Sequence, residues 1–375
     1  MIPFNKPFLI GSEIQYIEDA VRSGKISGNG KYTKMCQEFF EQQYGFKKAL
    51  LTSSCTDALE MAAILANIEE GDEVIIPSYT FVSTALAFVR QGAKIVFADS
   101  YSDNPNVDAS TIESLITSKT KAIVPVHYAG IACDMDVIMD LATKYNLLVI
   151  EDAAQAVDSF YIGKDGLKKA LGSIGHLAAF SFHETKNIIS GEGGMLTIND
   201  DRFIERAEII WEKGTNRSQF FRGEVDKYGW VDTGSSFLPS EVTAAFLWAQ
   251  VENIQIIQTK RKQLWEYYYK KLSPIATDLN IQLPFVPEYA TNNAHMFFIN
   301  FDALEQRSIA IQKLKEKEIL AVFHYISLHS SPYYHEKHDG RVLMNSDKFT
   351  NTLLRLPLFY ELTENEIDMI VSCFD

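Results

Sequence analysis

The chain has 375 residues, of which 46% are hydrophobic and 22% are charged. This composition excludes a disordered or fibrous protein, and the length allows two domains, since single domains usually contain about 100–200 residues. The formal net charge of −14 repels phosphate backbones on average, and no concentrated basic patch offsets it, so we expect no nucleic-acid partner.

Between residues 10 and 200, apolar strands alternate with amphipathic helices. Strands are expected at 49–51, 73–77, 94–99, 122–126 and 147–152, and helices at about 12–23, 56–66, 81–89 and 137–145. This alternation is typical of a mostly parallel sheet with helices on both faces. In such sheets, ligands bind just beyond the carboxyl ends of the strands.

After residue 200 the pattern changes. A helix at about 202–212 precedes a polar, aromatic-rich loop at 214–237, and a long helix follows at about 240–272. Beyond Pro284, strands at 295–300 and 319–323 and helices at 308–317 and after 363 predict a smaller α+β unit. We therefore expect an α/β protein with a large domain over 1–245 and a small C-terminal domain over 246–375.

Four scattered cysteines, without a Cys-x-x-Cys pair, argue against a disulfide framework and a cysteine-rich zinc site. The first residues lack the basic-then-apolar layout of a signal peptide. The most membrane-like stretch, 74–89, is interrupted by Pro77 and by several hydroxyl side chains. These features predict a cytoplasmic protein with no membrane partner.

The strongest local signal for chemistry is an apolar strand that leads to Ser181 and, five residues later, to Lys186, followed by glycines at 191, 193 and 194. A partly buried lysine beside such glycines suits Schiff-base chemistry, because burial lowers the pKa of its amine. A lysine on a turn is more often simply solvated. The interpretation therefore depends on its neighbours.

Three other strand ends supply candidate neighbours. Asp152 ends an almost entirely apolar strand, where its charge needs a partner such as a protonated pyridine nitrogen, unless it only caps the next helix. The turn at 52–59 starts a helix whose N–H groups suit a phosphate, although its hydroxyls also suit an ordinary cap. Phe81 follows a further strand end, where its ring either stacks on a planar cofactor or packs in the core.

These strand ends meet in one crevice, and together they match a pyridoxal phosphate site. Over essentially its whole length, the chain resembles the DegT/DnrJ/EryC1/StrS family of sugar-nucleotide aminotransferases. The resemblance implies fold type I of the pyridoxal-phosphate-dependent aminotransferases, with a mostly parallel central sheet, helices on both faces and a smaller α+β C-terminal domain.

The resemblance also implies roles for individual residues. Lys186 is expected to form the Schiff base with the cofactor and Asp152 to meet its pyridine nitrogen, so these two are the expected catalytic residues. The other expected cofactor contacts are Cys55, Thr56, Asp57 and Ser181 at the phosphate, Phe81 on the ring, Gln155 near the phenolic oxygen, and Ser236.

Ser236 lies in a segment that departs from the family pattern. Many members read Gly-Tyr-Asn-Tyr-Arg-Met where this chain reads Gly234 to Pro239, so Ser236 replaces the asparagine that reaches the partner subunit's cofactor phosphate, and Leu238 replaces the arginine. The resemblance implies a homodimer whose sites are shared between subunits. The candidate residues for binding the nucleotide are Arg217, Arg222, Lys227 and Tyr228, which suit a solvated, mobile loop equally well.

Within the family, the segments 181–187, 213–223 and 234–236 resemble those of transaminases that form dTDP-4-amino-4,6-dideoxy-D-galactose for surface polysaccharides. This resemblance predicts amino transfer from L-glutamate to C4 of a nucleotide-linked ketosugar, dTDP-4-keto-6-deoxy-D-glucose. The alternatives are a gluco-configured 4-amino product, an aminotransferase acting on a 3-keto sugar nucleotide, and a catalytically silent regulatory module that binds pyridoxal phosphate.

Other motifs support no function. No predicted carboxylate or cysteine cluster supports a metal site at His335 and His338, so we expect a solvated loop there. Gly30-Lys31 lacks the flanking residues of a P-loop, and Gly28-Asn29-Gly30 lacks the third glycine of a dinucleotide fingerprint. An NAD-dependent sugar-nucleotide epimerase or dehydratase is therefore disfavoured.

Overall fold

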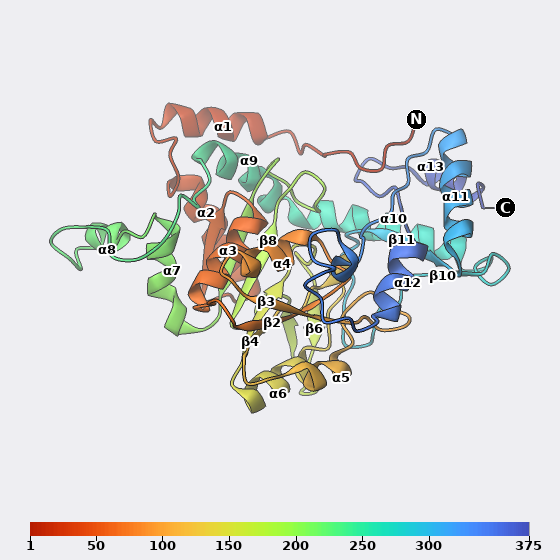
Figure 1. The fold of residues 1–375 in the computed structure, drawn as a ribbon. Helices are drawn as coiled ribbons and strands as arrows, with labels where there is room; N and C mark the ends of the chain where they lie inside the picture. The colour runs from red at the N-terminus through yellow and green to blue at the C-terminus, as the bar shows by residue number, and fades with distance from the viewer. Residues whose placement is uncertain (375) are drawn as a thin grey trace.

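A seven-stranded sheet forms the centre of the protein (Figure 1). The computed structural model describes residues 1–374. The strand order is β1-β9-β8-β5-β4-β2-β3, and β9 runs antiparallel to both of its neighbours while the others are parallel. The mostly parallel sheet is therefore confirmed. The strands are Lys48–Thr52 (β1), Glu73–Pro77 (β2), Lys94–Ala98 (β3), Thr120–Ile123 (β4), Leu148–Asp152 (β5), Leu177–Ser181 (β8) and Gly194–Ile198 (β9).

Helices cover both faces of this sheet, as expected. Successive residues of a strand point to opposite faces, so Leu51 and Val149 pack in one core cluster while Leu50 and Ile150 pack in another. The first cluster includes residues of Glu13–Arg22 (α1), Lys31–Tyr44 (α2), Ala109–Ile112 (α5), Met135–Tyr145 (α6) and Glu241–Glu252 (α9). The second includes residues of Cys55–Leu65 (α3), Val82–Val89 (α4) and Ile204–Trp211 (α7).

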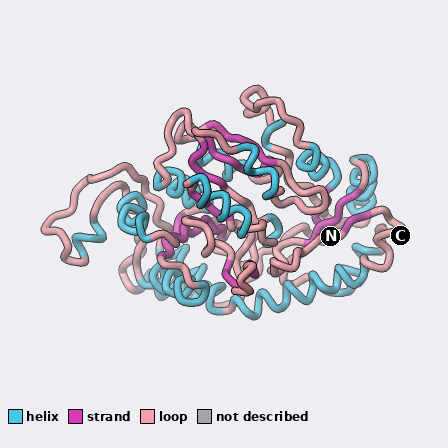
Figure 2. Tube along the Cα trace, turned by 90° about the horizontal axis from the view of Figure 1, so that it is seen from below, coloured by secondary structure: helices cyan, strands magenta, loops and turns pink. Residues whose placement is uncertain are grey.

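A smaller α+β unit follows and has its own antiparallel sheet, β10-β11-β12, with a third core cluster. Figure 2 shows this sheet near the two termini, apart from the larger one. Its elements are Ile254–Leu272 (α10), Ile281–Gln282 (β10), Phe297–Phe301 (β11), Leu304–Glu316 (α11), Met344–Thr352 (α12), Leu353–Leu356 (β12) and Glu364–Val371 (α13). The remaining elements are the hairpin Phe160–Ile162 (β6) and Lys168–Ala170 (β7), and Arg217–Phe221 (α8). The predicted domain division between residues 245 and 246 falls inside α9 and stays a prediction.

Two expected elements were wrong. The single helix expected at 240–272 is two helices, α9 and α10, separated at Asn253. The strand expected at 319–323 does not form a ladder, because Ile319 bridges only Ile2 and Val322 bridges only Arg355. None of the helices in the described part of the chain is long and apolar enough to span a bilayer.

Helix α2 was not expected from the sequence. Its start is stabilised by a distant side chain, because the buried carboxylate of Glu241 accepts hydrogen bonds from the N–H groups of Gly30, Tyr32 and Thr33 at 2.9, 2.8 and 3.2 Å. These N–H groups have no partner within the helix itself. The stabilising group lies more than 200 residues away, so the local sequence does not show where the helix begins, although Tyr32, Cys36, Phe40 and Tyr44 are buried at helical spacing.

Candidate active site

Lys186 lies in the turn that follows β8, and neighbouring side chains fix that turn. Asn187 donates to Gln258 Oε1 and to the carbonyl oxygen of Asn293, both at 2.8 Å, and its Oδ1 lies 2.8 Å from Nδ1 of His295. Lys186 is partly buried. This burial lowers the pKa of its amine to about 8, an effect increased by Arg355 and opposed by Asp152. A larger fraction of the amine is then neutral and nucleophilic near neutral pH than for a solvated lysine.

Asp152 is the last residue of β5 and is buried at the same edge of the sheet. Its carboxylate accepts a hydrogen bond from Thr84 Oγ1 at 2.7 Å and one from the N–H of Ala154 at 3.1 Å. Burial raises the pKa of this carboxyl, although both hydrogen bonds lower it. Within residues 1–374 no cationic side chain lies within ion-pair distance, so the carboxylate suits a cation supplied by a ligand.

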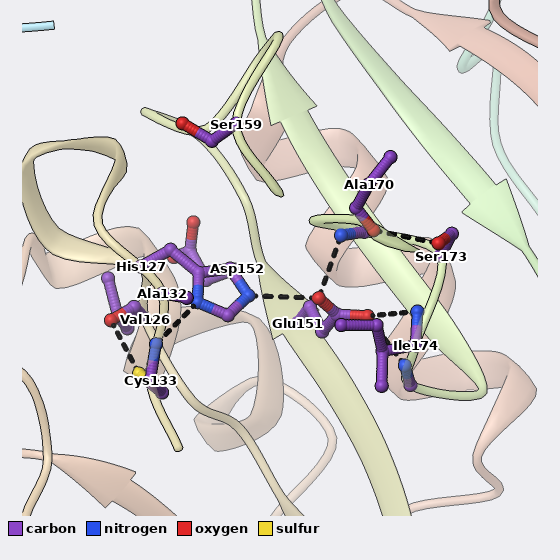
Figure 3. A network of polar contacts seen from close by, with 12 residues as sticks. Val126, His127, Ala132, Cys133, Glu151, Asp152, Ser159, Ala170, Ser173 and Ile174 are labelled. Carbon is purple, nitrogen blue, oxygen red and sulfur yellow. Dashed lines mark hydrogen bonds and ion pairs between the residues drawn. The ribbon is translucent and has the colours of Figure 1, made fainter. Parts of the chain in front are cut away.

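A buried network lies behind Asp152 on the other face of β5 (Figure 3). Nδ1 of His127 accepts from the N–H of Cys133 at 3.2 Å, so the neutral imidazole carries its proton on Nε2 and donates it to Glu151 at 2.9 Å. Glu151 accepts three further hydrogen bonds from the N–H groups of Gly172, Ile174 and Gly175. The network fixes β5 where it ends, and His127 also donates its own N–H to the Asp152 carbonyl at 3.1 Å.

The start of α3 offers open N–H groups to a phosphate. Ser54 caps the helix, since its Oγ accepts from the N–H of Asp57 at 3.0 Å. The N–H groups of Cys55 and Thr56 have no acceptor in the described chain, whereas that of Asp57 is already used. Burial raises the pKa of the Cys55 thiol, which therefore stays neutral and does not repel an anion.

Gly194, the first residue of β9, packs directly on this turn. A Cβ at this position would lie 2.3 Å from the carbonyl carbon of Ser54 and 2.4 Å from the nitrogen of Cys55, so only glycine allows the approach. Gly194 pairs with Thr52 on one side and with Ser181 on the other. The register therefore brings the predicted phosphate-binding residue Ser181 to the same edge as the α3 turn.

Gln155 and Phe81, the two residues expected at the ring, both lie near Tyr325 of the C-terminal unit. Nε2 of Gln155 donates to the Tyr325 hydroxyl at 3.3 Å, and its Oε1 accepts from the N–H of Ala129 at 2.6 Å. The ring of Phe81 lies 5.8 Å from that of Tyr325 and is 54% exposed, so it is not buried in the core. The sheet edge thus collects an anion cradle, a buried carboxylate, a lysine and exposed aromatic surface, a set that fits pyridoxal phosphate.

The structure does not bring the other expected residues to this place. Residues 213–237, which we call the arm, carry α8 away from the sheet (Figure 1) and return to it at Phe237, which is buried and whose carbonyl oxygen accepts from the N–H of Ser53 at 2.9 Å. Arg222 pairs with Glu208 and Glu224, each at 2.7 Å, and Arg217 lies 3.9 Å from Glu212. The exposed residues Lys227, Tyr228 and Ser236 also belong to the arm. Within residues 1–374 no hydrogen bond or ion pair links the arm to Lys186 or Asp152.

Three residues of this site were missed by sequence reasoning. The sequence does not single out Thr84, because it is one of several hydroxyl side chains in a short apolar helix. Tyr325 and Arg355 belong to the small C-terminal unit. The only hint for Arg355 was its place in an Arg-Leu-Pro-Leu segment. Their role depends on how the two units pack, which local periodicity does not report.

The model of the DegT/DnrJ/EryC1/StrS aminotransferase family matches residues 8–375. Spore coat polysaccharide biosynthesis protein SpsC of Bacillus subtilis is 31% identical over 380 residues, covering 99% of this chain and 95% of SpsC. Both matches span the large sheet and the small C-terminal unit.

Solved structures give the same result. The putative sugar aminotransferase Spr1654 from Streptococcus pneumoniae, in its PMP-form, superposes with a TM-score of 0.90 at 25% identity, covering 100% of this chain and 98% of that one. Its PLP-form gives a TM-score of 0.88 at 26% identity, with 100% and 97% coverage. The aminotransferase TlmJ from Streptoalloteichus hindustanus gives 0.90 at 25% identity, with 100% and 98% coverage. The fold is therefore that of fold type I aminotransferases, as expected.

Proposed function

This chain belongs to the DegT/DnrJ/EryC1/StrS aminotransferase family and is a pyridoxal-phosphate-dependent sugar aminotransferase, and we propose that it transfers the amino group of L-glutamate to C4 of dTDP-4-keto-6-deoxy-D-glucose. The product would be dTDP-4-amino-4,6-dideoxy-D-galactose. The observation that carries the amino-transfer chemistry is the convergence of Lys186, Asp152 and the α3 turn on one edge of the sheet. The alternative of a catalytically silent regulatory module is rejected, because the chain belongs to a family of aminotransferases.

When bound, pyridoxal phosphate carries the amino group between the two halves of the reaction and delocalises the electrons of the broken C–H bond. Lys186 removes the proton from the amino-bearing carbon of glutamate and later returns a proton to C4 of the sugar. Asp152 holds a proton on the pyridine nitrogen, and the Glu151–His127 network keeps its strand end in place. The N–H groups of Cys55 and Thr56 and the hydroxyl of Ser181 would hold the phosphate, while Phe81 and Gln155 would contact the ring.

The choice of sugar rests on a similar protein and on segments of the sequence. The SpsC relative is described as a polysaccharide biosynthesis protein, which supports a role in surface-polysaccharide synthesis. The preference for C4 and for the galacto product rests on the resemblance in the segments around Lys186 and Ser236. The face of the sugar carbon to which Lys186 returns the proton would decide between an axial and an equatorial amine.

A proton NMR spectrum of the product tests this assignment. The enzyme is incubated with L-glutamate and, in separate reactions, with the 4-keto and the 3-keto sugar nucleotide. We expect a product only from the 4-keto sugar, with small H3–H4 and H4–H5 couplings that indicate an axial amine. A large H3–H4 coupling would identify the gluco product, and amination only at C3 would identify the other alternative.

We also propose that the enzyme is a homodimer whose arm completes the partner subunit's active site. Two observations support a role for the arm in binding a second copy. It extends away from its own sheet (Figure 1), and it exposes 82% of Trp230 and 69% of Phe221, which is unusual for large apolar side chains. In this arrangement Ser236 would reach the partner subunit's cofactor, and Arg217, Arg222, Lys227 and Tyr228 would contact its nucleotide.

Mixed dimers test the arm. We expect a Lys186→Ala chain and a chain carrying Arg222→Ala and Lys227→Ala each to be inactive alone. A mixed dimer should recover about half the activity of a wild-type dimer, because one site then has both Lys186 and an intact arm. In the matched control, one chain carries Lys186→Ala, Arg222→Ala and Lys227→Ala together, and its partner chain is wild type. No recovery in isolated mixed dimers would refute the contribution of the arm in trans.

The cellular compartment is part of the proposal as well. All four cysteines, Cys36, Cys55, Cys133 and Cys373, are free. Free thiols persist where glutathione and thioredoxin keep them reduced, so we place the enzyme in the cytoplasm.

A further inference from the structure

The first turn of helix α4 contacts both ends of the candidate site. This helix follows directly after Phe81, the residue expected at the cofactor ring. Oγ of Ser83 lies 2.7 Å from Oγ1 of Thr56, in the turn that would hold the phosphate. The next residue, Thr84, donates to Oδ2 of Asp152 at 2.7 Å. A single turn of helix therefore joins the phosphate end of the site to the carboxylate end.

The hydroxyl of Thr84 is committed to Asp152. A threonine inside a helix often donates to a carbonyl oxygen of the preceding turn. Thr84 makes no such bond in the described chain, and its side chain is fully buried, so its proton is available only to the carboxylate. The other hydrogen bond to this carboxylate comes from the N–H of Ala154 at 3.1 Å. Thr84 is thus the one side chain within residues 1–374 that donates to Asp152.

A second buried threonine sets the direction of this hydrogen bond. Oγ1 of Thr80 lies 3.0 Å from Oγ1 of Thr84, and the N–H of Thr80 donates to the carbonyl oxygen of Ser78 at 3.1 Å. A hydroxyl has one proton and two lone pairs. Because the proton of Thr84 goes to Asp152, Thr84 accepts the proton of Thr80. Two successive hydrogen bonds therefore point toward the carboxylate, and such chains strengthen one another in a buried site.

This arrangement favours the ionised form of Asp152. Burial raises the pKa of the carboxyl, and the Thr84 hydrogen bond is the strongest of the effects that lower it, ahead of the Ala154 N–H and the charge of Lys186. A hydrogen bond to the charged form of an acid stabilises that form. Without it, Asp152 would be a stronger base and would compete better for a proton that it shares with a pyridine nitrogen.

We propose that Thr84, supported by Thr80, is a positioning residue that keeps Asp152 ionised and thereby keeps the shared proton on the pyridine nitrogen of bound pyridoxal phosphate; this rests on the proposed function. Thr84 acts only through Asp152, since its hydroxyl has no other acceptor in the part of the chain that the structure describes. A protonated ring draws the electrons of the broken C–H bond more strongly than a neutral one. The hydroxyl of Thr84 would therefore support the step in which Lys186 removes a proton.

Nuclear magnetic resonance of the labelled cofactor tests this role. Pyridoxal phosphate with ¹⁵N in its ring is bound to the purified enzyme, and the ¹⁵N chemical shift reports whether the nitrogen carries a proton. We expect a protonated nitrogen in the wild type and in Thr84→Ser, which keeps the hydroxyl. In Thr84→Val, which replaces the hydroxyl with a methyl group, the signal should move toward the unprotonated position. Thr80→Val should move it less and in the same direction.

Turnover should follow the spectrum. We expect Thr84→Val to lower turnover with L-glutamate about tenfold, which is the scale of one hydrogen bond to a charged group, and Thr84→Ser to restore most of it. Thr84→Ala removes the same hydroxyl with less bulk, and it takes the place of Thr84→Val if that variant does not fold.

Two variants control for packing. Thr197 is as buried as Thr84 but lies on β9 and donates to the carbonyl oxygen of Gly172 at 3.0 Å. Thr197→Val should lower the thermal midpoint without moving the ¹⁵N signal. Ser83→Ala changes the same turn of α4 but affects the phosphate end, so it should also leave the signal in place. An equal movement in either control would overturn the proposal.

Failure of the proposed function gives a different result. If the ring nitrogen of the wild-type enzyme carries no proton, the role of Asp152 fails, and that of Thr84 fails with it. If the wild-type nitrogen is protonated and the Thr84 variants without a hydroxyl keep the wild-type shift, the role of Thr84 is refuted while that of Asp152 stands. The identity of the ketosugar plays no part in the spectrum.

Discussion

Replacing Lys186 with alanine is expected to lower turnover by about 10⁴-fold or more, because one side chain supplies both the nucleophile and the proton carrier. The structure gives the physical reason. Lys186 is partly buried beside Asp152 and Cys55, its pKa is lowered to about 8, and Asn187 fixes its turn.

The measurement is steady-state amine transfer by purified Lys186→Ala, with circular dichroism and the thermal midpoint as tests of folding. Lys164→Ala is the matched control, because Lys164 is exposed on the loop of the β6–β7 hairpin and should leave turnover unchanged. Normal turnover by a correctly folded Lys186→Ala enzyme would show that the site has been assigned to the wrong residue.

Replacing Asp152 with asparagine is expected to preserve the fold but to lower turnover by about 100-fold or more, the scale of losing a charge that stabilises the transition state. The amide still accepts a hydrogen bond from Thr84 but carries no charge to hold a proton on the pyridine nitrogen. Burial raises the pKa of Asp152 in the protein alone, and a bound cation would lower it again.

Turnover and cofactor affinity of Asp152→Asn are measured together. Asp158→Asn is the matched control, since Asp158 is also buried but pairs with Lys262 at 3.3 Å. It should cost stability without a comparable loss of turnover. An Asp152→Asn enzyme with full activity would exclude the proposed role of this carboxylate.

The centre of the site was predictable because it depends on strand ends. Asp152 and Ser181 each end an apolar strand, and a parallel sheet brings such ends to one edge whatever the order of the strands. The turn before α3 was predictable because it follows the end of β1 and because Ser54 is a local helix cap. The pairing register places Gly194 at the same edge of the sheet, because Gly194 starts the antiparallel strand that lies between β1 and β8.

What could not be predicted depends on contacts between distant segments. Helix α2 starts where Glu241 accepts its N–H groups, and Arg355 reaches the site only because β12 turns one face toward the large sheet. The strand expected at 319–323 met no partner strand over its length. Local periodicity reports the apolar face of an element, but it does not report which distant element covers that face.

The role of Lys186 is tested most directly by finding which lysine carries the cofactor. Sodium borohydride makes a reversible link between pyridoxal phosphate and a lysine permanent, and digestion followed by mass spectrometry then locates the added mass. We expect a purified protein with visible cofactor absorbance and the added mass on the peptide that contains Lys186. Added mass on another lysine, or a protein that takes up cofactor without any such link, would contradict it.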